Sequence, residues 1–208
     1  MEKSYLKLVA PSSENRTVTP RRPPNRALRT REHLTVHEVE QLIKAMAGNR
    51  SAHRDGTMVL IAFRHGLRAS ELCDLRWEQV DFSRAVLHVR RVKNGTPATH
   101  PLTGRELRAL RRLQREQDPS SPFLFVSERG APFSTAGFAR LLQRAATKAD
   151  LGSLKVHAHM LRHATGFKLA NDGVDTRSLQ AYLGHRHISN TVKYTELSSQ
   201  RFRDFWQD

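Results

Sequence analysis

Apolar residues recur at intervals of three or four positions along most of the chain, which is the spacing of one face of an α-helix. Two of these segments open with a Thr followed three positions later by a Glu, at Thr35 and at Thr103, and such capping boxes mark helix starts. The pattern predicts helices over residues 35–47, 53–65, from about 69, 103–117, 134–149, 158–171, 175–183, 188–195 and 199–206.

The period changes between residues 80 and 101, where inward and outward positions alternate along residues 86–91. Lys93-Asn94-Gly95 follows, and Asn-Gly between two such runs is a strong signal for a β-hairpin. The apolar run at 123–126, turned by Arg129-Gly130, predicts one further short strand. We therefore expect a mainly α fold with a small antiparallel β-sheet, of the α+β class.

Residues 1–33 are rich in Pro, Arg, Ser and Asn and carry too little apolar surface to fold by themselves. We expect a disordered or extended basic arm there. Its role is either that of a strand lying along DNA phosphates or that of a solvated tail. Residues 34–208 are predicted to form one domain, which is long enough to bury a real core.

Lys and Arg number 35 against 20 Asp and Glu, so the net charge is +15. This balance favours a polyanionic partner, because neutralising phosphates releases counterions, although a ribosomal or chromatin-type protein is equally basic. The single cysteine, Cys73, excludes an internal disulfide framework and a thiolate metal cluster. No apolar run approaches the ~20 residues that span a bilayer, and no signal peptide is recognisable. We therefore expect a cytoplasmic protein with no membrane partner.

The segment Gly66–Leu72 places Arg68 at the start of a predicted helix. Backbone N–H groups at a helix start favour an anion, so the guanidinium and the helix start together indicate an anion site. Glu71, three residues later on the same face, can hold the guanidinium; the alternative is a surface ion pair of little energetic value. Lys93, at the hairpin tip, either donates a proton to a departing alkoxide or is a solvated turn lysine.

His159 and Arg162 are three positions apart, which places both on one face of the same predicted helix. A guanidinium binds two phosphate oxygens at once, and an imidazole accepts or donates a proton near neutral pH. His163 lies four positions after His159, and His185 and His187 follow, so a metal site is the alternative interpretation. The absence of an HExxH motif and of a cysteine partner argues against a metal, and the interleaved arginine would repel one.

Tyr194 is the candidate nucleophile at the end of this set. A phenol has a pKa of about 10, so it needs a base and a positive field nearby before it attacks. Packing at a helix end is the alternative role of Tyr194, and it is the role that we predict for Tyr5 and Tyr182.

Five segments in this order resemble the tyrosine recombinase (phage integrase) family over about residues 35–197, the span of its catalytic domain. Most members carry an N-terminal helical core-binding domain, whereas only about 34 residues precede Thr35 here. The chain looks like the short members, the fimbrial phase-variation invertases. The matching segments are Gly66–Leu72, Lys93 on its hairpin, His159-Met160-Leu161-Arg162-His163, Leu183-Gly184-His185 and Tyr194.

The resemblance implies that Arg68 and Arg162 bind the non-bridging oxygens of a DNA phosphate, with Glu71 as a supporting residue. His185 adds a third hydrogen bond. These donors stabilise the charge that develops in the pentacoordinate transition state.

The resemblance also implies that Tyr194 attacks this phosphate, after His159 has deprotonated or positioned its hydroxyl and with His163 as a supporting residue. Lys93 protonates the leaving 5′ oxygen. The product is a 3′-phosphotyrosine bond close in energy to a phosphodiester, so the strand rejoins another end without ATP. No metal and no cofactor is implied.

The implied partner is double-stranded DNA, bound by a homo-oligomer that grows from a dimer to a tetrameric synapse, with an accessory DNA-bending protein as a further candidate partner. The implied function is site-specific recombination by DNA inversion or integration, at inverted repeats of a bacterial mobile or phase-variable element, in the cytoplasm at the nucleoid. Two alternatives stay open: a topoisomerase IB-like enzyme that nicks and reseals DNA, and a DNA-binding regulator with vestigial catalysis.

Overall fold

The computed structural model describes residues 31–92, 95–117 and 120–196. Most of the basic segment predicted at 1–33, the hairpin residue Lys93 and the helix predicted at 199–206 lie outside these ranges. Arg31 begins the compact unit to which all of the helices and strands described below belong.

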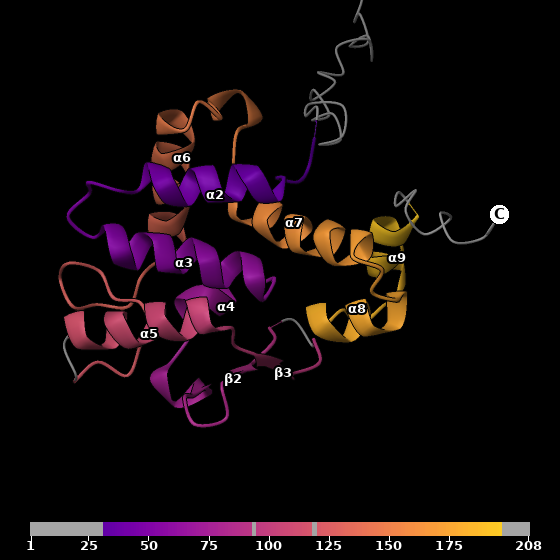
Figure 1. Ribbon diagram of the computed structural model, residues 1–208, viewed down its shortest axis with the longest axis horizontal. Coiled ribbons are helices and arrows are strands. Elements are labelled where there is room, and N and C mark those ends of the chain that lie inside the picture. The colour runs from indigo at the N-terminus through magenta and orange to yellow at the C-terminus, as the bar shows by residue number, and fades with distance from the viewer. Residues whose placement is uncertain (1–30, 93–94, 118–119, 197–208) are drawn as a thin grey trace, which may run out of the picture. The chain divides into compact units, whose positions relative to one another are not determined.

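Eight α-helices make up most of the described chain (Figure 1). In chain order they are α2 (Val36–Ala45), α3 (Ala52–Arg64), α4 (Ala69–Cys73), α5 (Gly104–Glu116), α6 (Thr135–Lys148), α7 (Ala158–Asn171), α8 (Thr176–Leu183) and α9 (Ser189–Thr195). Two single-turn 3-10 helices accompany them, η1 (Trp77–Gln79) and η2 (Gly152–Leu154). The helix ends lie within two residues of those that the apolar spacing predicted, so the mainly α prediction is confirmed.

Capping groups fix where these helices begin and end. Thr35 and Glu38 form the predicted capping box before α2, in which Oε2 of Glu38 accepts the backbone N–H of Thr35 at 2.7 Å. Thr103 and Glu106 do the same before α5, at 2.8 Å. At the other end, α8 stops at Gly184, whose φ of +65° is a left-handed conformation that favours glycine.

A three-stranded antiparallel sheet in the order β1-β2-β3 completes the fold, as expected for the α+β class. Its strands are β1 (Val80–Asp81), β2 (Val86–Val89) and β3 (Ala98–Pro101). Leu87 and Val89 are buried, while His88 between them is exposed. This alternation turns one side of β2 to the core, and Arg91 continues that side after the strand ends.

The strand predicted at 123–126 is wrong. The two ends of this segment form isolated bridges with different partners, Arg76 and Pro132, instead of one ladder. Leu124 and Phe125 in its middle are both fully buried, whereas a strand with one covered face buries every second residue. The run is apolar because it crosses the core.

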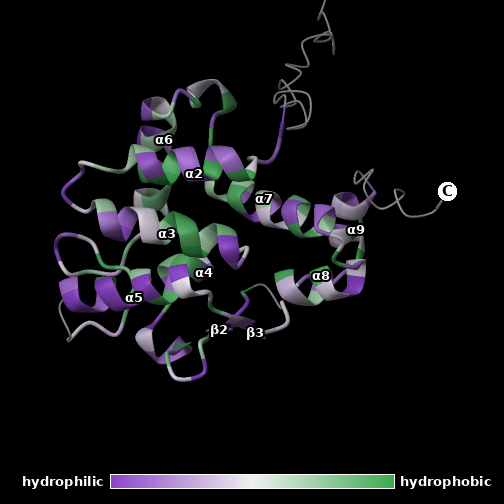
Figure 2. Ribbon diagram, in the orientation of Figure 1, coloured by the Kyte–Doolittle hydropathy of each residue, from purple (hydrophilic) through white to green (hydrophobic). Residues whose placement is uncertain are grey.

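Helix α3 lies at the centre of the core and packs against α2, α5 and α7. Its middle is hydrophobic, whereas α5 is mostly hydrophilic (Figure 2). Cys73 on α4 fills a small core position, where burial raises the pKa of its thiol to about 12. A second apolar cluster joins α7, α8 and α9 and consists of Ala170, Leu179, Leu183 and Tyr194. None of the helices in the described ranges is both long enough and apolar enough to span a membrane.

Candidate active site

The turn between α3 and α4 carries Arg68. Gly66 in this turn has a φ of +56°, and a Cβ there would lie 2.6 Å from Cδ2 of Leu183, so the glycine lets the turn rest on α8. Nη1 of Arg68 donates to Oε1 of Glu71 at 2.6 Å, and the backbone N–H of Arg68 donates to Oε2 at 2.9 Å. The side chain of Glu71 is 1% exposed and that of Arg68 is 25% exposed. The pair is therefore a fixed guanidinium with an accessible edge, not a solvated surface ion pair.

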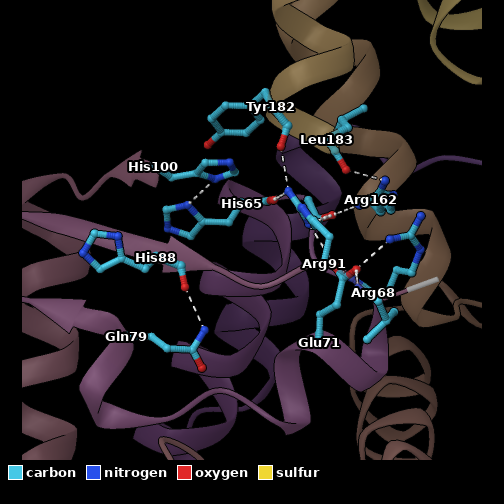
Figure 3. A network of polar contacts seen from close by, with 12 residues as sticks. His65, Arg68, Glu71, Gln79, His88, Arg91, His100, Arg162, Tyr182 and Leu183 are labelled. Carbon is cyan, nitrogen blue, oxygen red and sulfur yellow. Dashed lines mark hydrogen bonds and ion pairs between the residues drawn. The ribbon is translucent and has the colours of Figure 1, made fainter. Parts of the chain in front are cut away.

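Arg162 on α7 lies beside Arg68 (Figure 3). The residue is 1% exposed, and its Nη1 and Nη2 donate to the backbone carbonyls of Gly66 at 2.5 Å and Leu183 at 2.7 Å. No carboxylate in the described part of the chain forms an ion pair with it. Burial, followed by the positive charges of Arg68 and Arg91, lowers its pKa to about 10. A buried arginine whose hydrogen bonds go only to backbone carbonyls keeps its charge and its remaining donors for an anion.

His185 follows the glycine that ends α8. Its Nδ1 lies 2.8 Å from Oγ1 of Thr191 on α9, a buried residue that the sequence did not single out. Burial, together with the positive charges of Arg162 and Arg68, lowers the pKa of His185 to about 3, so the imidazole is neutral at pH 7. When the threonine hydroxyl donates to Nδ1, Nε2 carries the proton and is the donor left for a ligand.

Tyr194 on α9 is 1% exposed, and its hydroxyl lies 2.8 Å from Nδ1 of His163 on α7. Its ring rests on Gly166, where an added Cβ would come within 2.7 Å of the ring. Burial raises the pKa of Tyr194 to about 12, while the positive charges of Arg162 and Arg68 act in the opposite direction. The phenol therefore lies within the field of both guanidinium groups, which is what a tyrosine nucleophile needs.

The histidine that contacts the Tyr194 hydroxyl is His163, and His159 makes no hydrogen bond with it. His159 lies one turn earlier on α7, is exposed, and touches the ring of His163 edge to face, with 4.4 Å between centroids. Burial, followed by the charge of Lys193, lowers the pKa of His163 to about 3, so this imidazole is neutral and can accept the hydrogen bond of the phenol. Helical spacing places both histidines on one face, and the position of α9 decides which of them meets the tyrosine.

Arg91, just after β2, belongs to the same cluster although the sequence analysis did not select it. Its side chain is 0% exposed, and its Nη1 donates to Oε2 of Glu71 at 2.9 Å. The signal in the sequence was the alternation of Leu87, Val89 and Arg91, which places the arginine on the inward side. Lys93, two positions later, lies outside the described residues, so its role stays a prediction.

Three guanidinium groups around one carboxylate leave this cluster with a net positive charge. Such an excess suits a phosphate, whose charge it can balance. In the part of the chain that the structure describes, no three His, Cys, Asp or Glu side chains gather as ligands of a metal ion would.

Tyr182 makes the packing contacts predicted for it. Its ring stacks on that of His100, with 3.8 Å between centroids, and its hydroxyl donates to the backbone carbonyl of Arg64 at 2.8 Å. Its partner is a backbone carbonyl, which takes up no proton, whereas the hydroxyl of Tyr194 lies against an imidazole, so Tyr194 is the better candidate for the nucleophile.

The sequence description of the Phage integrase family matches residues 32–201. The chain belongs to this family. The prediction of a tyrosine recombinase is thereby confirmed. Over 180 residues this recombinase is 41% identical to the type 1 fimbriae regulatory protein FimB of Escherichia coli K12, which covers 85% of the chain and 90% of FimB.

Solved structures show the same fold. The recombinase superposes on the crystal structure of XerA recombinase with a TM-score of 0.70 and 28% identity, over 83% of this chain and 63% of the XerA chain. It also superposes on XerH site-specific recombinase bound to difH substrate in a pre-cleavage complex, with a TM-score of 0.70 and 22% identity, over 84% and 53% of the two chains. The recombinase therefore spans less than two thirds of XerA and XerH.

Proposed function

We propose that this recombinase cleaves and rejoins double-stranded DNA at specific sites through a 3′-phosphotyrosine bond to Tyr194. The observation that carries the proposal is the gathering of Arg68, Arg162 and His185 around one place next to a buried phenol. The fold that the chain shares with XerH, a recombinase solved with a DNA substrate, supports DNA as the partner.

In this proposal Arg68 and Arg162 bind the non-bridging oxygens of the scissile phosphate, and His185 donates a third hydrogen bond. Attack on phosphorus gathers negative charge on these oxygens, so donors placed in advance stabilise the transition state more than the ground state. Glu71 and backbone carbonyls already fix both guanidinium groups. Removing one such donor typically slows the reaction by about 10²–10³-fold.

The proton of the phenol leaves through the histidines of α7. His163 holds the hydroxyl of Tyr194 at 2.8 Å. The negative charge of the bound phosphate raises the low pKa of this imidazole, which then accepts the proton as the bond to phosphorus forms. His159 stands next to His163 at the exposed end of this pair, where it assists the transfer or positions the phosphate. As the P–O5′ bond breaks, Lys93 protonates the leaving 5′ oxygen, so one proton is lost and one is gained.

The phosphotyrosine bond keeps the energy of the broken phosphodiester, so a different 5′ hydroxyl can attack it without ATP. Cationic side chains of the protein supply the charge neutralisation that Mg²⁺ supplies in other phosphoryl transfer reactions. The proposed reaction therefore requires neither a metal ion nor a cofactor.

We further propose that the reaction inverts or integrates a segment bounded by inverted repeats. The similarity to FimB, a fimbriae regulatory protein that the chain matches over 90% of its length, supports this role. A complete exchange breaks every strand of both duplexes, which requires a homo-oligomer on DNA, up to a tetramer. An accessory DNA-bending protein brings the two sites together.

Covalent capture tests the proposal whatever the target sequence is. Nicked, sheared genomic DNA of the source organism is incubated with the protein and denatured, and the DNA that stays attached is sequenced. We expect wild-type protein to trap one family of sequences, because fragments beyond a nick diffuse away before rejoining. Tyr194→Phe should trap none, whereas Tyr5→Phe, the same change at a tyrosine assigned to no site, should trap as much as wild type. An adduct formed by Tyr194→Phe would contradict the proposal.

The captured sequence also distinguishes two other functions. A topoisomerase IB-like enzyme would relax a supercoiled plasmid that lacks this sequence, whereas a recombinase needs it. A DNA-binding regulator with vestigial catalysis would still act in cells after Arg162→Ala, and it would form no adduct at all.

A further inference from the structure

We propose that Arg91 is a positioning residue, which holds Arg68 and Arg162 toward one phosphate without touching DNA. The inference rests on the proposed function and deepens it, because it assigns a role to a residue outside the phosphate-binding set. The side chain of Arg91 is 0% exposed. Both of its Nη atoms already donate to Glu71 and to backbone carbonyls, so its effect on a phosphate passes through its neighbours.

Arg91 and Arg68 share one carboxylate (Figure 3). Nη1 of Arg91 donates to Oε2 of Glu71 at 2.9 Å, and Nη1 of Arg68 donates to Oε1 at 2.6 Å. The backbone N–H groups of Arg68 and Val92 bind the same two oxygens, at 2.9 and 3.2 Å. Because donors hold both oxygens from two sides, the carboxylate has one orientation and gives the guanidinium of Arg68 one fixed place.

Arg91 and Arg162 share one backbone carbonyl. The oxygen of Gly66 accepts from Nη1 of Arg162 at 2.5 Å and from Nη1 of Arg91 at 3.3 Å. Nη2 of Arg91 donates to the carbonyls of His65 at 3.2 Å and Tyr182 at 2.6 Å. Tyr182 precedes Leu183, whose carbonyl oxygen is the second acceptor of Arg162. Arg91 therefore ties the α3–α4 turn to the end of α8, and these are the two anchors of Arg162.

Two glycines make room for this side chain. A Cβ at Gly184 would lie 2.7 Å from Cγ and 2.9 Å from Nε of Arg91. A Cβ at Gly95 would lie 2.8 Å from Cβ of Arg91 and equally close to the carbonyl of Gly184. The glycine before His185 thus ends α8 and also admits the arginine, so the same contact places the start of the loop that carries the histidine.

Burial and like charge both act against the positive charge of Arg91 in the protein without a ligand. Its charge is one of the causes that lower the pKa of Arg162, after burial and the charge of Arg68. Burial lowers the pKa of Arg91 as well, and Glu71 opposes that effect. A well-packed apolar residue commonly stabilises such a position more than a buried ion pair does. An anion bound by Arg68 and Arg162 offsets the repulsion among the three guanidinium groups. The arrangement is therefore favourable when a phosphate is bound.

Arg91→Lys tests the assignment on the full chain with the captured DNA sequence. Lysine keeps the charge, but one ammonium group cannot bridge Glu71 and the backbone carbonyls together. We expect adduct formation to slow by about 10- to 100-fold at unchanged DNA affinity, because a misplacement of about 1 Å can cost 10²-fold. Arg105→Lys is the matched control, since Arg105 forms a two-point ion pair with Glu40 at the surface, at 2.6 and 2.8 Å.

A methylphosphonate at the scissile position separates positioning from a general loss of structure. This neutral group lacks the charge that the two guanidinium groups stabilise, so most of the slowing caused by Arg91→Lys should disappear on it. The double variant with Arg68→Ala should be slowed by less than the product of the two single effects, because the part of the Arg91 effect that passes through Arg68 is lost once and not twice. Equal slowing on phosphate and methylphosphonate, additive slowing in the double variant, or a wild-type rate would each overturn the proposal.

Folding of each variant is checked by circular dichroism and thermal melting. If Arg91→Lys does not fold, Arg91→Gln, which retains amide donors without the charge, is measured with the same expectations. Absence of any wild-type adduct would contradict the proposed function itself. A wild-type adduct combined with a normal rate in the folded Arg91 variant would contradict only the positioning role.

Discussion

The arginines of helix α5 are exposed to solvent, whereas the arginine of helix α7 is buried. On α5 the arginines face water, and Arg112 pairs with Glu116 one turn later at 2.6 Å. On α7 every residue from Met160 to Gly166 is buried, Arg162 and His163 included. An exposed ion pair contributes about 0–1 kcal/mol, whereas a charge in the interior is costly unless its surroundings use it. The position of an arginine relative to the apolar core therefore indicates function better than the number of arginines does.

The largest expected difference between the two helices is in the reaction rate. Arg162→Ala removes a preorganised cation, so we expect adduct formation on the captured sequence to fall by about 10²–10³-fold or more. Arg112→Ala on α5 removes a solvated ion pair and should leave the rate unchanged, with a change in stability below about 1 kcal/mol. Single-turnover gel assays and urea unfolding measure both quantities. Similar losses of rate in the two variants would show that the burial of an arginine does not indicate a role in the reaction.

The second expected effect is on stability and rate together, at Gly166 of α7, on which the ring of Tyr194 rests. Gly166→Ala should improve the propensity of α7 by about 1 kcal/mol, but the new Cβ would lie 2.7 Å from the ring of Tyr194. Overpacking of this kind typically costs about 1–3 kcal/mol, so we expect a lower melting temperature and slower adduct formation. Gly152→Ala is the control, because nothing lies within 4 Å of a Cβ there. A more stable Gly166→Ala protein with a normal rate would mean that Tyr194 does not rest on α7 in solution.

The sequence predicted the helices well because their apolar spacing is a local property, and Arg162 stood out as a charge within an apolar helix. The run at 123–126 was misassigned because an apolar segment without periodicity fits a strand and a core crossing equally. Arg91 was overlooked because a charge after the last apolar residue of a strand resembles a solvated strand end. Only the packing of α8 on the turn at Gly66 encloses it.

The two histidines of α7 are a second case in which tertiary packing decides what the local sequence cannot. Spacing places His159 and His163 on one face, but the sequence does not say where α9 crosses that face. The crossing puts the hydroxyl of Tyr194 on His163. Side-chain periodicity thus predicts which residues share a helix face, and tertiary packing selects their partners.

The smallest expected effect is on the pH dependence of stability, where a buried histidine of α7 should matter and an exposed histidine should not. Burial lowers the pKa of His163 from 6.5 to about 3. Between these values the unfolded chain binds a proton at this residue and the folded chain does not, so the free energy of unfolding falls as the pH drops below 6.5. From pH 7 to pH 5 we expect this histidine to account for a loss of about 2 kcal/mol at most. Glu71, whose pKa lies below its usual 4.5, contributes to acid lability only at lower pH.

Urea unfolding at pH 7 and pH 5 measures this loss. His163→Gln retains a hydrogen-bonding partner for Tyr194 but does not titrate, so the difference between the two pH values should shrink. His88→Gln, on the exposed side of β2, should leave the difference as it is in wild type. An unchanged difference in His163→Gln would place this imidazole in water. The phenol would then lack its observed partner, and His159 would become the better candidate for the base.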